Sequence, residues 1–166
     1  MIIIVFGLPG SGKSYFASKL AKRLEAKYVN SDVIRKQLFA VRKYSEEEKM
    51  KVYEVMIRAM KKAIQKDENI VLDATFYTEY IRNKFSKSAE VFKEKIIFIE
   101  VRTDENIRAD RLSLSREHSE ADYSIYLHIK KVFEPLRSEH LILRSTQENI
   151  KEMMGVALNY IKTSCG

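Results

Sequence analysis

The feature that most constrains this chain is an eight-residue run near its start. Residues 7–14 read Gly-Leu-Pro-Gly-Ser-Gly-Lys-Ser, a full match to the pattern G-x-x-x-x-G-K-[ST]. The apolar run 2–6 precedes it, and apolar residues at helical spacing follow from Phe16 to Leu24. A strand, a glycine-rich loop and a helix in this order predict a phosphate-binding loop.

The residue types of this loop suit the triphosphate of ATP. Glycines let backbone N–H groups approach phosphate oxygens, and the following helix adds partial positive charge at its N-terminus. We expect Lys13 to reach the β- and γ-phosphates and the Ser14 hydroxyl to ligate Mg²⁺. The residues predicted to bind ATP here are Gly7, Pro9, Gly10, Ser11, Gly12, Lys13, Ser14 and Tyr15.

The rest of the chain alternates strand and helix patterns. Strands are predicted at 27–29, 69–73, 95–101 and 140–143. Helices are predicted at 32–39, 45–66, 78–91 and 122–133 and from 145 onward, with capping boxes at 45–48 and 145–148. This alternation predicts right-handed βαβ units and a parallel α/β sheet in one domain, residues 1–166.

Two carboxylates follow predicted strands and become candidates for the chemistry. Asp73 ends an apolar strand, as a Mg²⁺-binding acid does in nucleotide-binding proteins of this type. Asp32 and Arg35 lie three residues apart, so a helix would place both on one face. There Asp32 could take a proton from an attacking hydroxyl, and Arg35 could bind an anionic acceptor. The structural alternative is a helix cap at Ser31 or Asp32 with a solvated Arg35.

A polar, arginine-bearing segment at about 104–120 is predicted to act as a lid over the nucleotide. Arginines stabilise the charge that develops on a transferred phosphoryl group, and a closing segment excludes water. Arg116 and Arg111 are the favoured catalytic candidates, ahead of Arg108; the alternative is a solvated helix face. Arg82, on the helix after Asp73, is a weaker candidate for substrate binding.

Composition narrows the setting. The 166 residues carry a formal charge of +7, which suits an anionic ligand. The single cysteine, Cys165, cannot form an internal disulfide, no secretory signal is present and no apolar run could span a membrane, so we expect a cytoplasmic protein without membrane partners. The three histidines show no metal-ligand spacing.

These residues resemble a known family, the small P-loop kinases related to the kinase domain of polynucleotide kinases and, more loosely, gluconate kinases and zeta-toxin sugar kinases. The resemblance runs from Met1 to about Pro135. Besides the loop at 7–14, it rests on the segments 30–35, 71–75, 111–116, 119–122 and 133–135.

The resemblance implies a three-layer α/β fold with five parallel strands in the order 2-3-1-4-5 and a helical lid after strand four. It implies that Asp32 is the general base, that Arg35 contacts the acceptor, and that Arg116 or Arg111 is the lid arginine. It also places Arg144 and Thr146 near the adenine.

The predicted function is transfer of the γ-phosphoryl group of ATP, with Mg²⁺, to a hydroxyl. The first hypothesis for the acceptor is the 5′-OH end of a nucleic acid, which the positive charge and Arg35 favour mildly. The alternative is a small molecule such as a sugar, nucleoside or antibiotic. An ATP-binding switch or ATPase without an acceptor is a third hypothesis, and the oligomeric state is left open.

Overall fold

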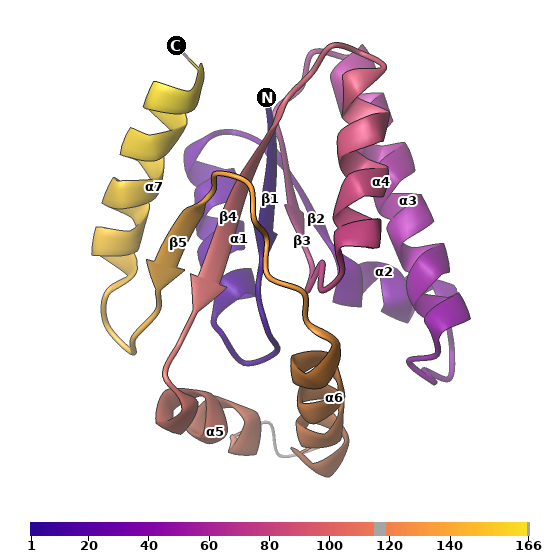
Figure 1. Cartoon of the computed structure of the whole chain (residues 1–166), viewed down its shortest axis with the longest axis vertical. Coiled ribbons are helices and arrows are strands. Elements are labelled where there is room, and N and C mark those ends of the chain that lie inside the picture. The colour runs from indigo at the N-terminus through magenta and orange to yellow at the C-terminus, as the bar shows by residue number, and fades with distance from the viewer. Residues whose placement is uncertain (115–118, 166) are drawn as a thin grey trace.

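The computed structural model describes residues 1–114 and 119–165, and it is built around a parallel sheet (Figure 1). The strands are β1 (Ile2–Phe6), β2 (Lys27–Asn30), β3 (Ile70–Asp73), β4 (Ile96–Arg102) and β5 (Leu141–Arg144). They pair in the order β2-β3-β1-β4-β5, and every pair is parallel, which confirms the predicted fold class and strand order.

The helices follow the strands in sequence and surround the sheet. They are α1 (Lys13–Arg23), α2 (Ser31–Leu38), α3 (Glu46–Gln65), α4 (Glu79–Glu90), α5 (Glu105–Ser113), α6 (Ser119–Val132) and α7 (Ile150–Cys165). None of these helices, over the described ranges, is long and apolar enough to cross a membrane.

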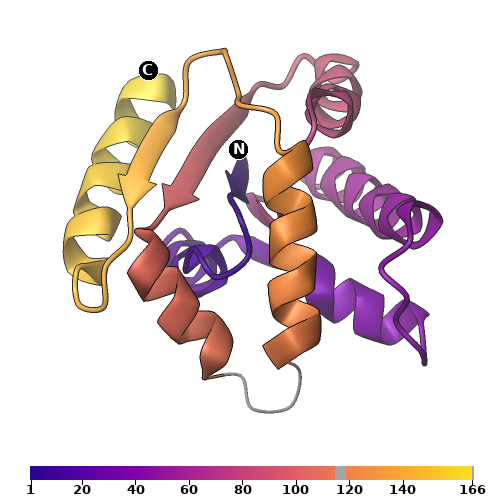
Figure 2. The ribbon, with the colours of Figure 1, turned by 60° about the horizontal axis from the view of Figure 1, so that its bottom comes forward.

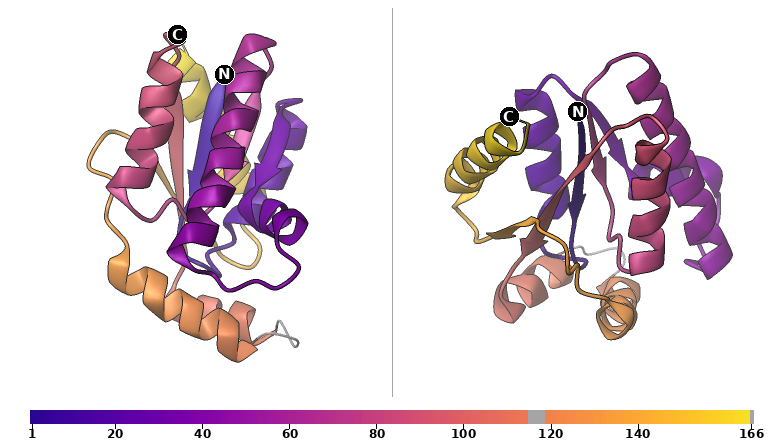
Figure 3. Two further views of the ribbon diagram at one scale, coloured as in Figure 1. Left: turned by 90° about the vertical axis from the view of Figure 1, so that its right-hand side faces the viewer. Right: turned by 45° about the horizontal axis from the view of Figure 1, so that its top comes forward.

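The central strand β1 explains the three layers. All five of its residues are buried, and successive side chains point to opposite faces of the sheet. Ile2, Ile4 and Phe6 pack with residues of α3 and α4, whereas Ile3 and Val5 pack with α1 and α7. Figure 3 shows the sheet between these two helical layers. A run without polar residues is therefore required at this central position.

The first capping box forms in part. The Ser45 hydroxyl accepts a hydrogen bond from the Glu48 N–H at 3.2 Å, which caps α3. Glu48 does not return the bond to Ser45, because its carboxylate accepts the Lys43 N–H at 2.8 Å. Glu48 is thereby held under the loop that joins α2 to α3.

The second capping box, expected at 145–148, is wrong. Ser145 continues the pairing of β5 by donating its N–H to the Arg102 carbonyl at 2.7 Å. The Asn149 side chain then closes a turn by accepting the Thr146 N–H at 2.8 Å, and α7 begins at Ile150. The segment is a loop at the carboxyl end of β5, because its polar side chains satisfy the local backbone instead of capping a helix.

The segment predicted as a lid contains α5 and the start of α6. Both helices lie beyond the carboxyl ends of the strands, as Figure 2 shows. Arg108 of α5 joins them: its guanidinium lies 3.1 Å from the Tyr126 hydroxyl and 5.0 Å from the centre of that ring. Ile129 of α6 reaches the core beneath, so this pair of helices is packed onto the sheet edge.

Candidate active site

The phosphate-binding loop has the backbone that its glycines predict. Gly7 and Gly12 have φ values of 149° and 88°. A Cβ at Gly7 would lie 2.3 Å from the Val101 carbonyl oxygen, and one at Gly12 would lie 2.8 Å from both Arg111 Nη1 and Ser145 Oγ. Glycine is needed at these positions for backbone conformation and for close packing against β4 and α5.

A cleft of about 500 Å³ opens beside this loop. Most of the predicted ATP-binding residues line it: Pro9, Gly10, Gly12, Lys13, Ser14 and Tyr15. Gly7 and Ser11 do not; both are buried beneath the loop, and Ser11 donates its N–H to the Leu8 carbonyl at 3.2 Å. The cleft continues past the loop to α2, α3 and α6.

A second cavity, of about 210 Å³, adjoins the cleft on the side of α7. Gly12, Tyr15 and Arg111 line both spaces, and Thr146 lines the second one. This cavity lies next to the phosphate-binding loop, and the contact of Thr146 with the adenine stays a prediction. Arg144 lines neither space, because its side chain is exposed and lies 3.7 Å from the Asp104 carboxylate.

Arg111 of the predicted lid donates hydrogen bonds to the phosphate-binding loop and to the segment after β5. Its guanidinium donates to the Gly10 carbonyl at 3.4 Å, the Ser145 hydroxyl at 3.0 Å and the Thr146 carbonyl at 2.8 Å. Burial and the nearby charge of Arg108 lower its pKa. Arg116 lies outside the described residues.

Asp73 sits at the base of the cleft in a network of hydrogen bonds. It is fully buried, and its Oδ2 accepts from the Tyr28 hydroxyl and from Asn30 Nδ2, both at 2.6 Å. Asn30 Nδ2 also lies 3.5 Å from the Ser14 hydroxyl. Burial and the charge of Asp73 raise the pKa of Tyr28, which keeps its hydroxyl protonated as a donor.

The residues around Asp73 fit a divalent cation. The other oxygen, Oδ1, is buried and has no hydrogen-bond partner among the described residues. A buried carboxylate oxygen without a partner is costly, and a hard cation such as Mg²⁺ prefers oxygen ligands. Ser14, on the same network, supplies the second predicted oxygen.

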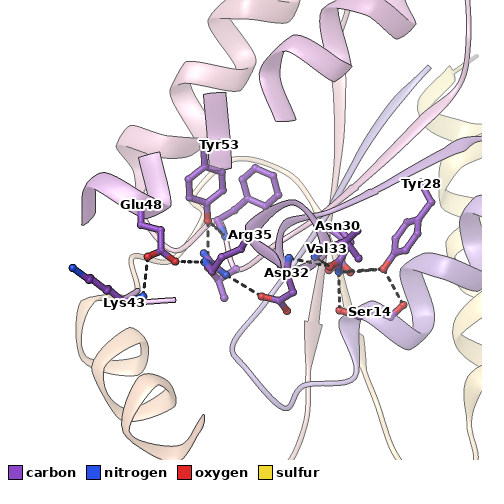
Figure 4. Close-up of polar contacts among 12 residues, drawn as sticks. Ser14, Tyr28, Asn30, Asp32, Val33, Arg35, Lys43, Glu48 and Tyr53 are labelled. Carbon is purple, nitrogen blue, oxygen red and sulfur yellow. Dashed lines mark hydrogen bonds and ion pairs between the residues drawn. The ribbon is translucent and has the colours of Figure 1, made fainter. Parts of the chain in front are cut away.

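Asn30 also determines where α2 begins. Its Oδ1 accepts the N–H groups of Asp32 and Val33 at 2.9 and 3.0 Å, so Asn30 caps the helix in place of Ser31 or Asp32. Figure 4 shows the resulting line of contacts from Ser14 through Asn30 to the first turn of α2. One side chain thus connects the predicted metal site to the predicted base.

Asp32 and Arg35 both line the cleft, on one face of α2. Arg35 is buried, with Nη1 3.0 Å from Asp32 Oδ1 and Nε 3.3 Å from Glu48 Oε1 (Figure 4). The Asp32 side chain is 67% exposed, and Oδ2 makes no hydrogen bond within the described part of the chain. Arg35 therefore orients a carboxylate whose second oxygen remains open to an acceptor.

Three tyrosines complete the far wall of the cleft. The Arg35 guanidinium lies 4.9 Å from the centre of the Tyr44 ring. The Tyr53 hydroxyl accepts the Phe76 N–H at 3.1 Å, and burial raises the pKa of Tyr53 to about 12. The third tyrosine, Tyr77, donates its hydroxyl to a carboxylate on α3 at 2.9 Å. All three residues line the cleft.

The prediction that Arg82 binds substrate is wrong. Its side chain is 2% exposed, and its guanidinium donates to the Phe76 and Glu134 carbonyls, both at 2.8 Å. It also lies 5.9 Å from the centre of the Phe6 ring. Arg82 links α4 to the segment after α6. The periodicity of α4 could not show that this later segment packs against Arg82.

Sequence reasoning missed the contributions of Tyr28, Asn30 and Glu48. Tyr28 and Asn30 alternate on β2 with their side chains toward Asp73, a relation that depends on β2 lying next to β3. Glu48 reads as half of a capping box and acts as a buried partner of Arg35. The one signal in the sequence for Tyr28 and Asn30 was that these polar residues alternate along a short strand, which indicates side chains on the same face.

The comparisons agree with this geometry. Residues 2–136 match the AAA_33 family, which is described as an AAA domain. Among curated proteins, none matches the chain significantly in sequence.

Solved structures share the fold at low sequence identity. An APS kinase from Mycobacterium tuberculosis is 16% identical with a TM-score of 0.76, covering 97% of each chain. A gluconokinase from Sinorhizobium meliloti 1021 is 19% identical with a TM-score of 0.73, covering 95% of this chain and 89% of that one. A sugar kinase from Janibacter is 12% identical with a TM-score of 0.74, covering 96% of this chain and 93% of that one. With 135 of its residues inside the family match, the chain belongs to the AAA_33 family of AAA domains.

Proposed function

We propose that this protein transfers the γ-phosphoryl group of ATP to a hydroxyl group of a small molecule. The observation that carries the proposal is that Asp32 and the phosphate-binding loop line the same cleft. Asn30 links the helix that bears Asp32 to Ser14 and Asp73. A protein that only bound ATP would not need an oriented carboxylate at this second position.

The chain's own residues account for the transfer. Lys13 and the loop N–H groups hold the β- and γ-phosphates, and Arg111 stabilises charge on the phosphates from the α5 side. Asp32 accepts the proton of the acceptor hydroxyl. The hydroxyl oxygen bonds to the γ-phosphorus, and the bond between that phosphorus and the bridging oxygen of ADP breaks. Ser14 and Asp73 would hold Mg²⁺, which neutralises phosphate charge when bound.

Several observations support a small acceptor over a nucleic acid. Ile125 and Ile129 of α6 line the cleft together with residues of α2 and α3, so the acceptor region is enclosed by several elements. The similar structures include a gluconokinase and a sugar kinase, and the APS kinase structure holds AMPPNP and APS. The polynucleotide acceptor, our first hypothesis from the sequence, has no comparable support.

The test is a transfer assay with γ-labelled ATP and Mg²⁺. The acceptors would be a panel of sugars, sugar acids, nucleosides and their phosphates, with a single-stranded 5′-OH oligonucleotide included for comparison. We expect label in at least one small molecule, identified by mass spectrometry, and none in the oligonucleotide. Label in the oligonucleotide alone would contradict the proposed acceptor class, and ADP formation that no acceptor stimulates would favour an ATPase.

A further inference from the structure

We propose that the acceptor carries an anionic group, such as a phosphate, sulfate or carboxylate, and that Lys36 and Arg42 bind this group. This inference rests on the proposed function and identifies the class of molecule that the same site would accept. It concerns the half of the cleft that lies beyond the phosphate-binding loop. Lys36 and Arg42 line this half of the cleft without a carboxylate partner among the described residues, and a neutral acceptor would leave both charges unpaired.

The face of α2 places the proposed subsite next to the base. Asp32, Arg35 and Lys36 are at positions i, i+3 and i+4, which lie on one side of a helix, and all three line the cleft. Lys36 is four residues, about 6 Å along the helix axis, from Asp32. Arg42, from the loop between α2 and α3, lines the same space.

Among the described residues, two of the four cations that line this half of the cleft are paired with carboxylates. Arg35 is paired with the carboxylates of Asp32 and Glu48, and Lys49 is paired with Glu46 at 2.7 Å. These pairs hold the wall of the cleft together.

Lys36 and Arg42 differ from those two residues. Neither makes an ion pair or a hydrogen bond with any residue in the described part of the chain, although Arg42 is half-buried. A half-buried guanidinium that faces a cleft gains most from an anionic partner, because such a pair is strengthened where water is partly excluded. Arginine also matches the geometry of phosphate, sulfate and carboxylate groups with paired N–H donors.

The nucleotide would not satisfy these charges. Lys13 and the loop N–H groups belong to the segment that holds Ser14, and Arg111 contacts Gly10 of that segment, whereas Lys36 and Arg42 come from elements that follow β2. Asp32 lies on the face that carries Lys36, so an anion bound there would sit beside the reacting hydroxyl. The acceptor is thus expected to be held at one end by charge and to present its hydroxyl to Asp32.

The experiment uses the whole protein loaded with AMP-PNP and Mg²⁺, so that the phosphate-binding loop is occupied. Sulfate, inorganic phosphate and acetate are then titrated in separate calorimetric experiments. We expect sulfate or phosphate to bind the loaded protein and to bind the Lys36→Gln/Arg42→Gln variant at least about tenfold more weakly, as the loss of charge-assisted hydrogen bonds predicts. Preference for acetate would assign the subsite to carboxylates.

A matched control is available on α1. Lys22→Gln/Arg23→Gln makes the same change in charge at two exposed residues outside the cleft. It should bind the anions like the wild type. Thermal unfolding and AMP-PNP affinity of both variants should match the wild type, which separates loss of the subsite from loss of the fold.

The outcomes distinguish this inference from the proposed function. If the loaded wild type bound none of the three anions, or if the cleft variant bound them as tightly as the α1 control, the anionic subsite would be wrong while the kinase proposal stood. Failure of the wild type to bind AMP-PNP would overturn both. In the transfer assay, acceptors that carry an anionic group should outperform their neutral counterparts in the wild type, and the advantage should disappear in the cleft variant.

Discussion

The two halves of the cleft are built in different ways. The nucleotide half comes mainly from one contiguous segment, residues 9–15, whose backbone conformation follows from its glycines. The acceptor half is assembled from α2, the loop after it, α3 and α6, and its charged side chains are largely paired with one another. Asn30 joins the halves by capping α2 and donating to Asp73.

This difference shows which kind of specificity each half can carry. A loop of N–H groups recognises phosphate, which is common to all nucleotides, and needs little variation. The acceptor half depends on side chains from separate elements, so its chemistry can change without disturbing the phosphate-binding loop. The predictions below test whether the halves can be separated in this way.

The largest effect is expected at Lys13. Lys13→Ala removes the cleft-lining cation that we propose binds the β- and γ-phosphates, so phosphoryl transfer should fall by about 10³-fold or more, and ATP should bind more weakly. Labelled-ATP transfer and equilibrium binding measure the two effects. Lys22→Ala, on the exposed side of α1, is the control; if both variants behaved alike, the loop would not be the phosphate site.

The packing of the nucleotide half can be tested with two glycines. Gly7→Ala should destabilise the protein by about 2 kcal/mol or more, because its Cβ would lie 2.3 Å from the Val101 carbonyl oxygen at a φ of 149°. Gly155→Ala should stabilise it by about 0.5–1 kcal/mol, because Gly155 is inside α7 and nothing lies within 4 Å of its Cβ. Urea unfolding measures both; equal effects would contradict the loop packing.

The junction between the halves is expected to show an intermediate effect. Asn30→Ser keeps a helix-capping hydroxyl but is too short to donate to Asp73, so transfer should fall about tenfold with little change in stability. Asn30→Leu removes both functions and should cost about 1 kcal/mol more in unfolding free energy. A fully active Asn30→Ser variant would show that the contact to Asp73 does not matter for transfer.

The smallest effect is expected where α5 meets α6, outside both halves. Hydrogen bonds from Lys130 and Tyr126 lower the pKa of Glu105 below its ordinary value of 4.5. Glu105 therefore stabilises the folded state above that ordinary value, and the contribution is lost as pH falls through the lowered pKa. Because Glu105 is exposed, Glu105→Gln should cost less than about 1 kcal/mol at pH 7 and nothing at pH values below both pKa values.

Thermal unfolding at several pH values tests this prediction. Glu152→Gln on α7 serves as the control, because Glu152 is exposed and makes no ion pair within the described residues. A destabilisation by Glu105→Gln that was the same at acidic and neutral pH would contradict the assigned contacts.

The sequence predicted most of the fold because its signals were local. Continuous apolar runs identified β1, β3 and β4, and the glycine-rich motif fixed the junction of β1 and α1. The start of α7 was misplaced because Ser145 satisfies a capping pattern, yet its N–H completes the pairing of β5 with β4. A local pattern cannot show that the Ser145 N–H is already hydrogen-bonded to a neighbouring strand.

The site was predictable where one element supplies the residues and less so where several meet. Asp32 and Arg35 share a face of α2, so their spacing was sufficient to place them together. The partners Glu48 and Asn30 could not be assigned, since their roles depend on how α3 packs against α2 and on the pairing of β2 with β3. Arg82 was misassigned for the same reason: one of the two carbonyls that bind it, that of Glu134, comes from a distant part of the chain.

The most direct test of the central claim is a paired measurement on Asp32→Asn: ATP affinity, and transfer to whichever small molecule the wild type phosphorylates. We predict that transfer falls by about 10²–10⁴-fold, the usual contribution of a general base, because an amide cannot take the hydroxyl proton. ATP affinity should remain close to that of the wild type, since Asp32 lies in the acceptor half. Undiminished transfer, or the loss of ATP binding together with transfer, would contradict the account.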